Sequence, residues 1–542
     1  MYSTRGSARF RIKGWIDDEE FDKLREIARY LGSYNGYKLF ELDLDRAKAN
    51  GYTPGDILSL LSSINGIVNE DLDRVRRILE ETSKVIIYLA DDGWLRVGGR
   101  IYLKPLLREL GIYLPYDRES SAYKAPPHMY RRLVEFFRSK GLLVDDRLGL
   151  IDDNELPRRM EFHGELRPYQ DEAFRAWLEN GGQGIIALPT GAGKTVIAIA
   201  AMAKLNKRTL IVVYTKEHVK QWIDAIARFS NAAGMTGAYY SEEKRLAPIT
   251  VTTYQSAHRY IKKLAPHFSL AIFDEAHHLP AEKFRAIAVG LPAPYRLGLS
   301  ATPEREDGKH EELFPLLGGV VYRSSPGELT SRGYLAPYVI RTIKVDLDPD
   351  EKSKYKALRR KYFNLARGRS FQELLRDAKN GDPDAIEALR VHKEMEKIVQ
   401  YSKAKLRAVE KIVRDELMKG NKIIVFTQLR GQAEEIARRV GGLLLHGGID
   451  KKRRDLVLEK FKRASKGVLV LTTVGDEGLD IPDASVGILV SGTGSPRQFI
   501  QRLGRLLRPS PGKQGAILYE VIVKGTMEEF RSRKRKNLGL PW

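Results

Sequence analysis

Short apolar runs alternate with helical patterns of apolar and polar residues over much of the chain. Five runs precede residue 300, at 185–188, 210–214, 250–253, 270–273 and 295–299. After an interruption near 345–401, five more follow, at 422–426, 441–445, 468–471, 486–490 and 516–521. Strands that alternate with helices in this way usually build parallel sheets. The pattern predicts an α/β fold with two parallel-sheet halves and an insert between them.

The first 150 residues show a different, mixed pattern. Apolar residues at 21, 24, 27, 28 and 31 fall at helical spacing, a strand-like run occupies 85–89, and a second helical pattern surrounds 130–137. Residues 11–16 and 96–101 each begin a stretch that continues with Leu-Arg-Glu and then a Tyr-Lys pair. We interpret this either as a duplicated strand–helix–strand unit or as coincidence between two small α+β pieces.

Composition narrows the class of protein. A length of 542 residues suggests about three or four domains. The chain has no cysteine, no apolar signal core at its start and no uninterrupted apolar run long enough for a membrane span. We therefore expect a cytoplasmic protein without a membrane partner. The net charge of +22 is typical of proteins that bind a polyanion, nucleic acid above all, although a merely soluble basic protein is the alternative.

A glycine-rich loop follows the first apolar run and opens a helical segment. Its sequence is Leu188-Pro189-Thr190-Gly191-Ala192-Gly193-Lys194-Thr195. Between a strand and a helix, the glycines let backbone N–H groups approach phosphate oxygens. Lys194 can reach the β- and γ-phosphates, and the Thr195 hydroxyl can bind Mg²⁺. Leu188 stands where the general pattern has a glycine, so a chance loop is the alternative. We predict that ATP is bound by Thr190, Gly191, Gly193, Lys194 and Thr195.

Two adjacent carboxylates end the apolar run at 270–273. Asp274 and Glu275 lie about 80 residues after the glycine-rich loop. In a phosphate-binding α/β fold, this strand end faces the phosphates. We predict that Asp274 holds Mg²⁺ and that Glu275 orients and deprotonates the attacking water. A surface acidic pair is the alternative, and the loop upstream makes it the weaker one.

The second half ends with a basic helical segment, Gln501 to Arg508. Arg505 and Arg508 are three residues apart and share a helix face. Two guanidinium groups on one face suit a γ-phosphate whose charge redistributes during transfer, so we predict that both are catalytic. A helix lying on nucleic acid is the alternative, a role that Arg502 also suits.

A second basic stretch lies in the insert. Between Lys352 and Arg369 there are eight Lys or Arg residues and no acid, and three aromatic residues interleave with them. Cations neutralise phosphates and release counterions, and aromatic rings stack on unpaired bases. We predict DNA contacts from Lys356, Arg359, Arg360 and Lys361. A solvated helical face with its aromatic side chains in a core is the alternative. The C-terminal run at 531–536 is either a phosphate anchor or a disordered end.

With these motifs in place, residues of about 160–530 resemble the core of a superfamily 2 helicase. Arg167 and Gln170 match the adenine-reading motif, and Ser300-Ala301-Thr302 matches the motif that couples hydrolysis to strand movement. The stretch from Thr472 to Asp480 matches the motif that links the second lobe to nucleotide and strand, which implies nucleotide contacts from Gly478 and Asp480. The resemblance also implies that Thr215, Thr253 and Thr472 touch the DNA backbone.

The resemblance narrows to the XPB family of repair and transcription helicases. Arg305-Glu306-Asp307 is similar to the Arg-Glu-Asp loop of the family, and the insert stands where the family has a helical thumb. Arg305 suits a phosphate contact, whereas the two acids suit a wedge or a contact between lobes. The resemblance implies two RecA-like parallel-sheet lobes with a helical thumb insert and an N-terminal α+β region.

These observations predict the following division of the chain. We expect an α+β extension at 1–83, a damage-recognition-like domain at 84–158, an ATP-binding lobe at 159–325, a connector at 326–349, a helical thumb at 350–401, a second lobe at 402–526 and a basic tail at 527–542. The extension departs from the family pattern, so its role is open.

The function implied by the resemblance is ATP- and Mg²⁺-dependent 3′→5′ DNA translocation or opening in nucleotide excision repair. It implies a fork or bubble as substrate, a nucleoid location in the cytoplasm and a structure-specific nuclease as partner. A duplex translocase that does not separate strands, an ATP-switched DNA clamp and an RNA helicase are the alternatives.

Overall fold

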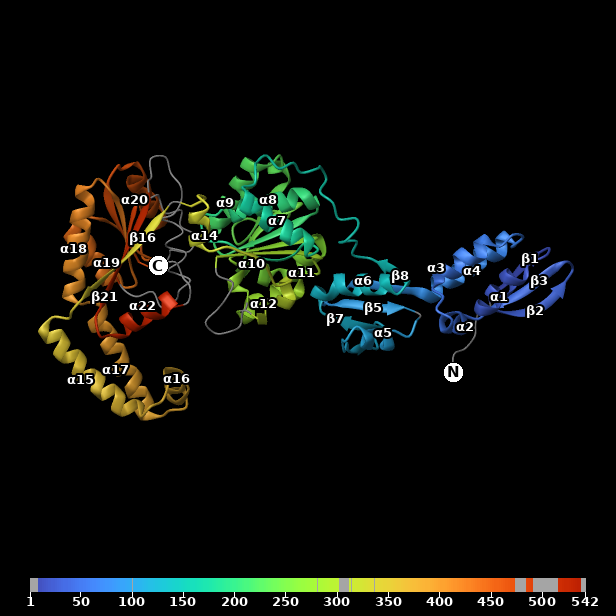
Figure 1. Cartoon of the computed structure of the whole chain (residues 1–542), viewed down its shortest axis with the longest axis horizontal. Coiled ribbons are helices and arrows are strands. Elements are labelled where there is room, and N and C mark those ends of the chain that lie inside the picture. Colours follow the sequence, from blue (N-terminus) through green and yellow to red (C-terminus); the bar gives the residue numbers. More distant parts are fainter. Residues whose placement is uncertain are drawn as a thin grey trace.

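The computed structural model describes residues 8–99, 101–279, 281–301, 311–312, 314–335, 337–472, 484–490 and 515–537. Four folded parts follow one another along the longest axis of the molecule (Figure 1). Two small α+β parts, in blue and cyan, precede a green α/β lobe and an orange to red α/β lobe. A group of helices extends from the last lobe.

The first lobe is built on a seven-stranded sheet of order β11-β12-β10-β13-β14-β9-β15, and all of its strand pairs are parallel. The five predicted runs form its five central strands, so the α/β prediction is confirmed, and two flanking strands were not predicted. Its strands are β9 (Gln183–Ala187), β10 (Thr209–Val213), β11 (Thr236–Tyr239), β12 (Ile249–Thr253), β13 (Leu270–Asp274), β14 (Tyr295–Ser300) and β15 (Val320–Arg323).

Helices cover both faces of this sheet, because its strands are near-continuous apolar runs that must be buried on both sides. Two buried clusters result, one containing Ile186, Ile211 and Ile272 and the other containing Ile185, Leu210 and Phe273. The main helices are α7 (Pro168–Glu179), α8 (Lys194–Leu205), α9 (Lys216–Phe229), α10 (Tyr254–Arg259), α11 (Ile261–Leu264), α12 (Glu282–Gly290), α13 (Phe314–Leu317) and α14 (Pro326–Ser331).

The second lobe has a six-stranded sheet of order β16-β21-β20-β17-β19-β18, again with parallel pairs throughout. One of its strands comes from the segment expected to be a connector, since β16 pairs with β21 along its whole length. The strands are β16 (Tyr338–Val345), β17 (Lys422–Thr427), β18 (Leu443–Leu445), β19 (Gly467–Thr472), β20 (Val486–Leu489) and β21 (Ala516–Val523). Its helices are α18 (Lys403–Met418), α19 (Arg430–Val440), α20 (Lys451–Arg463) and α22 (Met527–Asn537).

Three helices occupy the predicted insert: α15 (Pro349–Ala366), α16 (Phe371–Lys379) and α17 (Pro383–Gln400). A small core that includes Tyr355, Val391 and Met395 joins α15 and α17 to Val523 at the end of β21. We call these three helices the thumb. The end of the chain is not a disordered tail as far as residue 537, because α22 buries Ser532, whose hydroxyl donates a hydrogen bond to Glu520 at 2.8 Å.

The two N-terminal parts contain one shared structural unit. The first contains β1 (Arg9–Lys13), α1 (Asp18–Ile27), β2 (Ala28–Tyr34) and β3 (Tyr37–Leu42), followed by α2 (Leu44–Ala49), α3 (Pro54–Ser63) and α4 (Asn69–Ser83). The second contains β4 (Lys84–Leu89), β5 (Leu95–Gly99), α5 (Lys104–Glu109), β6 (Tyr116–Asp117), β7 (Ala122–Ala125), α6 (Tyr130–Ser139) and β8 (Leu143–Asp146). In both, a strand, a helix and a hairpin form an antiparallel sheet with the last strand in the middle, β1-β3-β2 and β5-β7-β6. This order favours duplication over coincidence.

Two details of the pattern were wrong. The helical spacing through residues 28 and 31 does not continue α1, because Ala28 begins β2 and pairs with Leu42 of β3. The Tyr-Lys pairs are not equivalent between the two copies either. Matching Arg11 with Arg96, as the repeat does, gives an offset of 85 residues in the first strand. Because Phe10 pairs with Phe40 and Leu95 with Ala125, the last strand then has the same offset, and Lys38 corresponds to Tyr123.

No helix in the described ranges is long and apolar enough to cross a membrane.

The second lobe contains a charged pair that is almost fully buried. The ammonium of Lys405 on α18 donates hydrogen bonds to Glu528 on α22 and, at 2.8 Å, to the carbonyl of Val490 after β20. Burial lowers the pKa of Lys405, and Glu528 opposes that shift.

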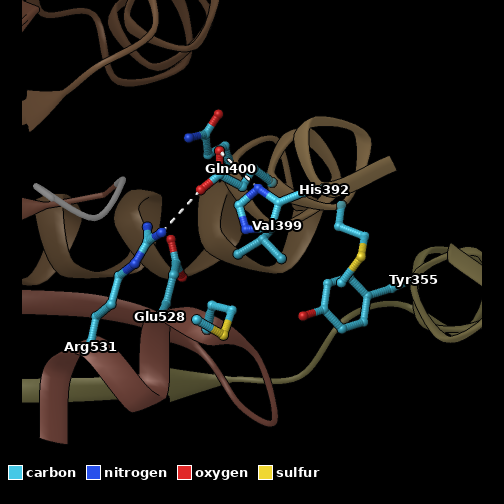
Figure 2. A pocket seen from close by; sticks show the side chains of 9 residues that line it. Tyr355, His392, Val399, Gln400, Glu528 and Arg531 are labelled. Atoms are coloured by element: carbon cyan, nitrogen blue, oxygen red, sulfur yellow. Dashed lines mark hydrogen bonds and ion pairs between the residues drawn. The ribbon is translucent and has the colours of Figure 1, made fainter. Parts of the chain in front are cut away.

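A small pocket between the thumb and α22 is lined by Tyr355, His392, Glu528 and Arg531 (Figure 2).

We predict that Lys405→Met loosens the joint between α18, α22 and the end of β20. The substitution leaves the Glu528 carboxylate buried without its cation, which typically costs about 3–5 kcal/mol. Hydrogen exchange of amides in β20 and α22 is the appropriate measurement, because a chain of several parts has no single free energy of unfolding.

The matched control is Lys524→Met, which removes an exposed ion pair with Asp346 and should change exchange by less than about 1 kcal/mol. Equal effects of the two substitutions would contradict the role given to the buried pair.

Candidate ATPase site and strand-contact surface

The candidate site lies at the carboxyl edge of the first sheet. Because all strands are parallel, the chain leaves every strand at this edge. The order of the sheet places the ends of β9, β14 and β13 side by side, followed by those of β10 and β12. The glycine-rich loop follows β9, the predicted coupling motif begins at the end of β14, and Asp274 ends β13. Thr215 follows β10, and Thr253 ends β12.

The glycine-rich loop is shaped by two left-handed glycines. Gly191 has φ 87° and Gly193, which caps the N-terminus of α8, has φ 77°. A Cβ atom on Gly193 would lie 2.3 Å from Nε2 of Gln170, so only glycine fits there. The first N–H groups of α8 point out of the helix at this loop, which suits an anion.

Three polar groups of the loop fit a bound triphosphate. The hydroxyl of Thr190 is buried and has no hydrogen-bond partner among the described residues. The Lys194 ammonium donates hydrogen bonds to the carbonyls of Leu188 at 3.0 Å and Pro189 at 3.3 Å, within the loop itself. Thr195 is the next residue of α8. Both the unpartnered hydroxyl and the lysine have interactions to gain from phosphate oxygens.

The predicted adenine-reading residues support the loop from behind. Gln170 is almost fully buried; its amide donates to the Ala192 carbonyl at 3.0 Å and accepts from the Arg167 N–H at 2.9 Å. The Arg167 guanidinium donates to the Tyr334 carbonyl at 3.3 Å. Tyr169, which was not predicted, donates its hydroxyl to the same Ala192 carbonyl at 2.7 Å. The structure therefore connects this motif directly to the phosphate loop.

Three hydrogen bonds fix the position of Asp274. Its Oδ2 accepts a hydrogen bond from the indole N–H of Trp222 at 2.8 Å, and its Oδ1 accepts one from the Glu275 N–H at 3.0 Å. The hydroxyl of Tyr254 donates to its carbonyl at 3.0 Å. Burial, and then the charges of Asp274 and Glu275, raise the pKa of Tyr254 well above its ordinary value, so this donor keeps its proton.

Glu275 adopts a left-handed conformation with φ 52°, which is costly for a residue with a side chain and therefore often marks a functional site. The Nδ1 atom of the fully buried His277 lies 3.2 Å from Oε2 of Glu275 and 3.2 Å from Oγ of Ser300 at the end of β14. His277 thus connects the predicted catalytic base to the predicted coupling motif at 300–302.

Thr215 and Thr253, which are predicted to contact the DNA backbone, cap the starts of two helices in the first lobe. The hydroxyl of Thr215 accepts from the His218 N–H at 3.3 Å at the start of α9, and that of Thr253 accepts from the Ser256 N–H at 3.3 Å at the start of α10. Thr253 is almost fully buried. Any contact with a DNA strand at Thr253 therefore comes mainly from the backbone N–H groups at the start of α10.

Part of the predicted site lies outside the described residues: Arg305, Gly478, Asp480, Arg505 and Arg508. Of the residues predicted in the second lobe, Thr472 lies in the described ranges. Thr472 is the last residue of β19, is almost fully buried, and pairs with Thr427 at the end of β17.

The basic residues of the thumb divide into two kinds. Lys356, Arg359 and Arg360 on α15 are exposed, but the Lys361 ammonium is paired with Glu387 of α17 at 2.7 Å. Arg390 and Lys361 lower the pKa of Glu387 to about 2. Among the aromatic residues of this helix, Tyr355 is buried in the thumb core and Phe363 is 59% exposed. Only Phe363 of these two can stack on a base.

Sequence reasoning missed Trp222, Tyr254 and His277 as parts of the site. The signal for Trp222 is weak, since a tryptophan on an amphipathic helix usually indicates a core position. Its contact with Asp274 depends on β10 lying beside β13, and sheet order cannot be derived from the apolar runs alone.

The phosphate loop, the acidic strand end and the two parallel-sheet lobes define an ATP-dependent helicase core. Comparison with known proteins agrees. A model of the ERCC3/RAD25/XPB C-terminal helicase matches residues 387–539, and a model of the type III restriction enzyme, res subunit, matches residues 163–305. The DNA 3′-5′ translocase XPB2 of Sulfurisphaera tokodaii is 39% identical over 432 residues, which cover 78% of this chain and 95% of that protein. The chain belongs to the XPB family.

Two further proteins are similar to this chain, one by sequence and one by structure. The DNA 3′-5′ helicase XPB of Kineococcus radiotolerans is 32% identical, over 68% of this chain and 62% of that protein. Among solved structures, the Hef helicase domain of Pyrococcus furiosus is 22% identical with a TM-score of 0.47, over 68% of this chain and 98% of that one.

We predict that Trp222→Phe reduces ATP turnover and raises the Mg²⁺ concentration needed for half-maximal turnover. The substitution keeps an aromatic ring on α9 but removes the donor to Asp274, and hydrogen bonds to charged groups are worth about 1.5–3 kcal/mol. An effect of about tenfold or more should appear in a Mg²⁺ titration of the ATPase rate.

Trp177→Phe is the matched control. Trp177 is also a buried tryptophan whose indole N–H is bonded, in this case to the Arg296 carbonyl at 2.9 Å, away from the loop and Asp274. If both variants shift the Mg²⁺ dependence equally, Trp222 has no specific part in positioning Asp274.

Proposed function

We propose that this protein is an ATP-dependent DNA motor that moves 3′→5′ along one strand and opens DNA during repair. The observation that carries the proposal is the arrangement of Asp274 and Glu275 at the carboxyl edge of the first sheet, next to the phosphate loop and next to the helix starts at Thr215 and Thr253. The names of the Kineococcus and Sulfurisphaera relatives, a 3′-5′ helicase and a 3′-5′ translocase, support the polarity.

In this proposal, residues of the first lobe bind and orient ATP. Lys194 exchanges its loop carbonyls for phosphate oxygens, and Thr190 gains a partner. Thr195 and Asp274 hold Mg²⁺, which when bound neutralises charge between the β- and γ-phosphates. Glu275 accepts a proton from the attacking water, and His277 restrains its carboxylate.

The second lobe completes the site. Arg505 and Arg508 stabilise the charge of the γ-phosphate, and Gly478 and Asp480 contact the nucleotide. Thr472 holds the DNA strand from the same lobe, while Thr215 and Thr253 hold it from the first lobe. Closing and opening of the lobes then alternates these grips and moves the strand.

The thumb and the loop at Arg305 supply further DNA contacts in this proposal. A fork or bubble is the preferred substrate. A structure-specific nuclease is the proposed partner, because a repair role requires cleavage at the opened junction and the sequence contains no nuclease motif that we recognise.

The first test is a strand-displacement assay on forked DNA with a 3′ single-stranded arm, beside a triplex-displacement assay on blunt duplex. We expect strand separation that requires ATP and the 3′ arm. Glu275→Gln should retain ATP binding and lose turnover by about 10²–10⁴-fold, since proton transfer to a positioned base contributes that much.

Two outcomes would change the proposal. Triplex displacement without strand separation would establish a duplex translocase, which the name of the Sulfurisphaera relative, a DNA 3′-5′ translocase, also fits. Turnover that survives in Glu275→Gln would remove Glu275 as the base, and stronger stimulation by RNA than by DNA of equal sequence would identify an RNA helicase.

A second test concerns the thumb. We predict that the double substitution Arg359→Ala, Arg360→Ala weakens DNA binding and reduces the salt slope by about two, because each phosphate contact contributes about one unit to it. Lys361→Ala is the matched control, since this lysine is already neutralised by Glu387. Fluorescence anisotropy over a series of salt concentrations measures both, and equal slopes for the two variants would argue against a DNA contact through Arg359 and Arg360.

A further inference from the structure

The sheet of the N-terminal part, residues 8–83, has one buried face and one open face. Helices α1, α3 and α4 pack on the first face, where Phe10, Ile12 and Phe40 are fully buried. Side chains alternate along a strand, so the neighbouring residues point to the other side. Figure 1 shows this part at the end of the molecule that lies away from the two lobes.

The strand register orders the open face into three rows. Lys13, Tyr37 and Tyr34 form the first row, Arg11, Leu39 and Gly32 the second, and Arg9, Glu41 and Arg29 the third. Four cations and two tyrosines therefore share a face with one carboxylate. Gly32 has no side chain, which leaves the middle of the face flat.

The charge of this face contrasts with the rest of the N-terminal part. Residues 8–83 contain fifteen acids and twelve basic residues, and twelve of the acids lie in the four helices. On the open face, Arg9 pairs with Glu41 at 3.2 Å and Arg11 pairs with Asp71 at 2.6 Å. Within the described residues, Lys13 and Arg29 have no ion pair. The face is therefore positive on a part of the chain that is negative as a whole.

Large aromatic side chains stand at one end of this face. Trp15, two residues after the end of β1, is 80% exposed, and Tyr34, at the end of β2, is 77% exposed. Tyr34 belongs to the row of Lys13 and Tyr37, and Trp15 follows Lys13 in the chain. Exposed apolar side chains that gather on one face mark interaction sites, whereas singly scattered ones are ordinary. Aromatic rings beside cations are the arrangement that binds unpaired bases and their phosphates.

The second copy of the same unit lacks this combination. With the offset of 85 residues, Lys13 and Tyr37 correspond to Gly98 and Ala122, and a Cβ atom on Gly98 would lie 3.3 Å from that of Ala122. The cation equivalent to Arg11 is Arg96, which is almost fully buried and paired with Asp92 at 2.9 Å and Asp117 at 3.2 Å. The open, positive and aromatic face is thus a property of the first copy and does not follow from the topology alone.

We propose that the face formed by β1, β2 and β3 binds single-stranded DNA. Trp15, Tyr34 and Tyr37 stack on bases, and Lys13 and Arg29 contact phosphates. Single strands fit better than duplex, because the bases of a duplex are already stacked inside it. The choice of DNA over RNA rests on the proposed function, in which the motor itself produces a single strand.

The test is photo-crosslinking of the full chain to a thymidine-rich DNA strand that contains iododeoxyuridine, followed by peptide mapping. We expect crosslinks within residues 9–42, at Trp15, Tyr34 or Tyr37. The double substitution Trp15→Ala, Tyr34→Ala should remove the crosslinks at these two residues and lower the affinity for a long single strand by about thirtyfold, since stacking of each base contributes about fivefold or more. Trp15→Phe, Tyr34→Phe keeps the stacking surfaces and should retain both.

Tyr113→Ala is the matched control, because Tyr113 is 92% exposed and lies in the second copy. Crosslinks confined to the lobes and the thumb would overturn the proposal, as would equal losses in the alanine and phenylalanine variants. Equal crosslinking by RNA or by duplex of the same sequence would overturn the choice of ligand. The ATPase rate of the wild-type chain separates the two proposals: absence of stimulation by DNA contradicts the motor, whereas stimulation without crosslinks in 9–42 contradicts only this inference.

Discussion

The common direction of the strands in the first sheet is the constraint on which the candidate site depends. Because every pair is parallel, the loops after β9, β13 and β14 leave the sheet at the same edge as those after β10 and β12. The phosphate loop, the two carboxylates and the helix starts at Thr215 and Thr253 are therefore brought together without any long connection. A single antiparallel strand among the five would carry its loop to the opposite edge.

The pairing of β10 with β13 links the predicted DNA contact at Thr215 to Asp274. Thr215 ends the segment after β10 and starts α9, and Trp222 on the same helix donates to Asp274 after β13. A shift of α9 caused by a bound DNA strand would therefore displace the hydrogen-bond donor of Asp274, the proposed metal ligand. On the other side of Asp274, Glu275, His277 and Ser300 form a second link, to the end of β14. The contacts in both links are no longer than 3.2 Å, and the hydrogen bonds among them, from Trp222 to Asp274 and between His277 and Ser300, weaken steeply when a helix moves.

The sequence allows prediction of those features that depend on local pattern. Apolar runs identified the central strands, and the glycines of the loop were predictable because the spacing of Gly191, Gly193 and Lys194 is itself the phosphate-binding geometry. Features that depend on tertiary neighbours were not predictable. Trp222 resembles a core residue until β10 is known to lie beside β13, and Lys361 resembles a free cation until α17 brings Glu387 to it. Ala28 and Leu31 fit a helix until Ala28 is seen to pair with Leu42 of β3.

Charge and burial explain why the two N-terminal copies differ on a shared backbone. The second copy is joined to the first lobe through Arg131 on α6, whose guanidinium donates to the carbonyls of Gly181 and Pro294. Its equivalent of Arg11 is nearly buried, and there the guanidinium is paired with the carboxylates of Asp92 and Asp117. The first copy keeps its sheet face in water, where Lys13 and Arg29 need no partner and Trp15 is left exposed. The cation of the second copy is already neutralised by its own carboxylates, whereas Lys13 and Arg29 of the first copy stay available to an anionic ligand.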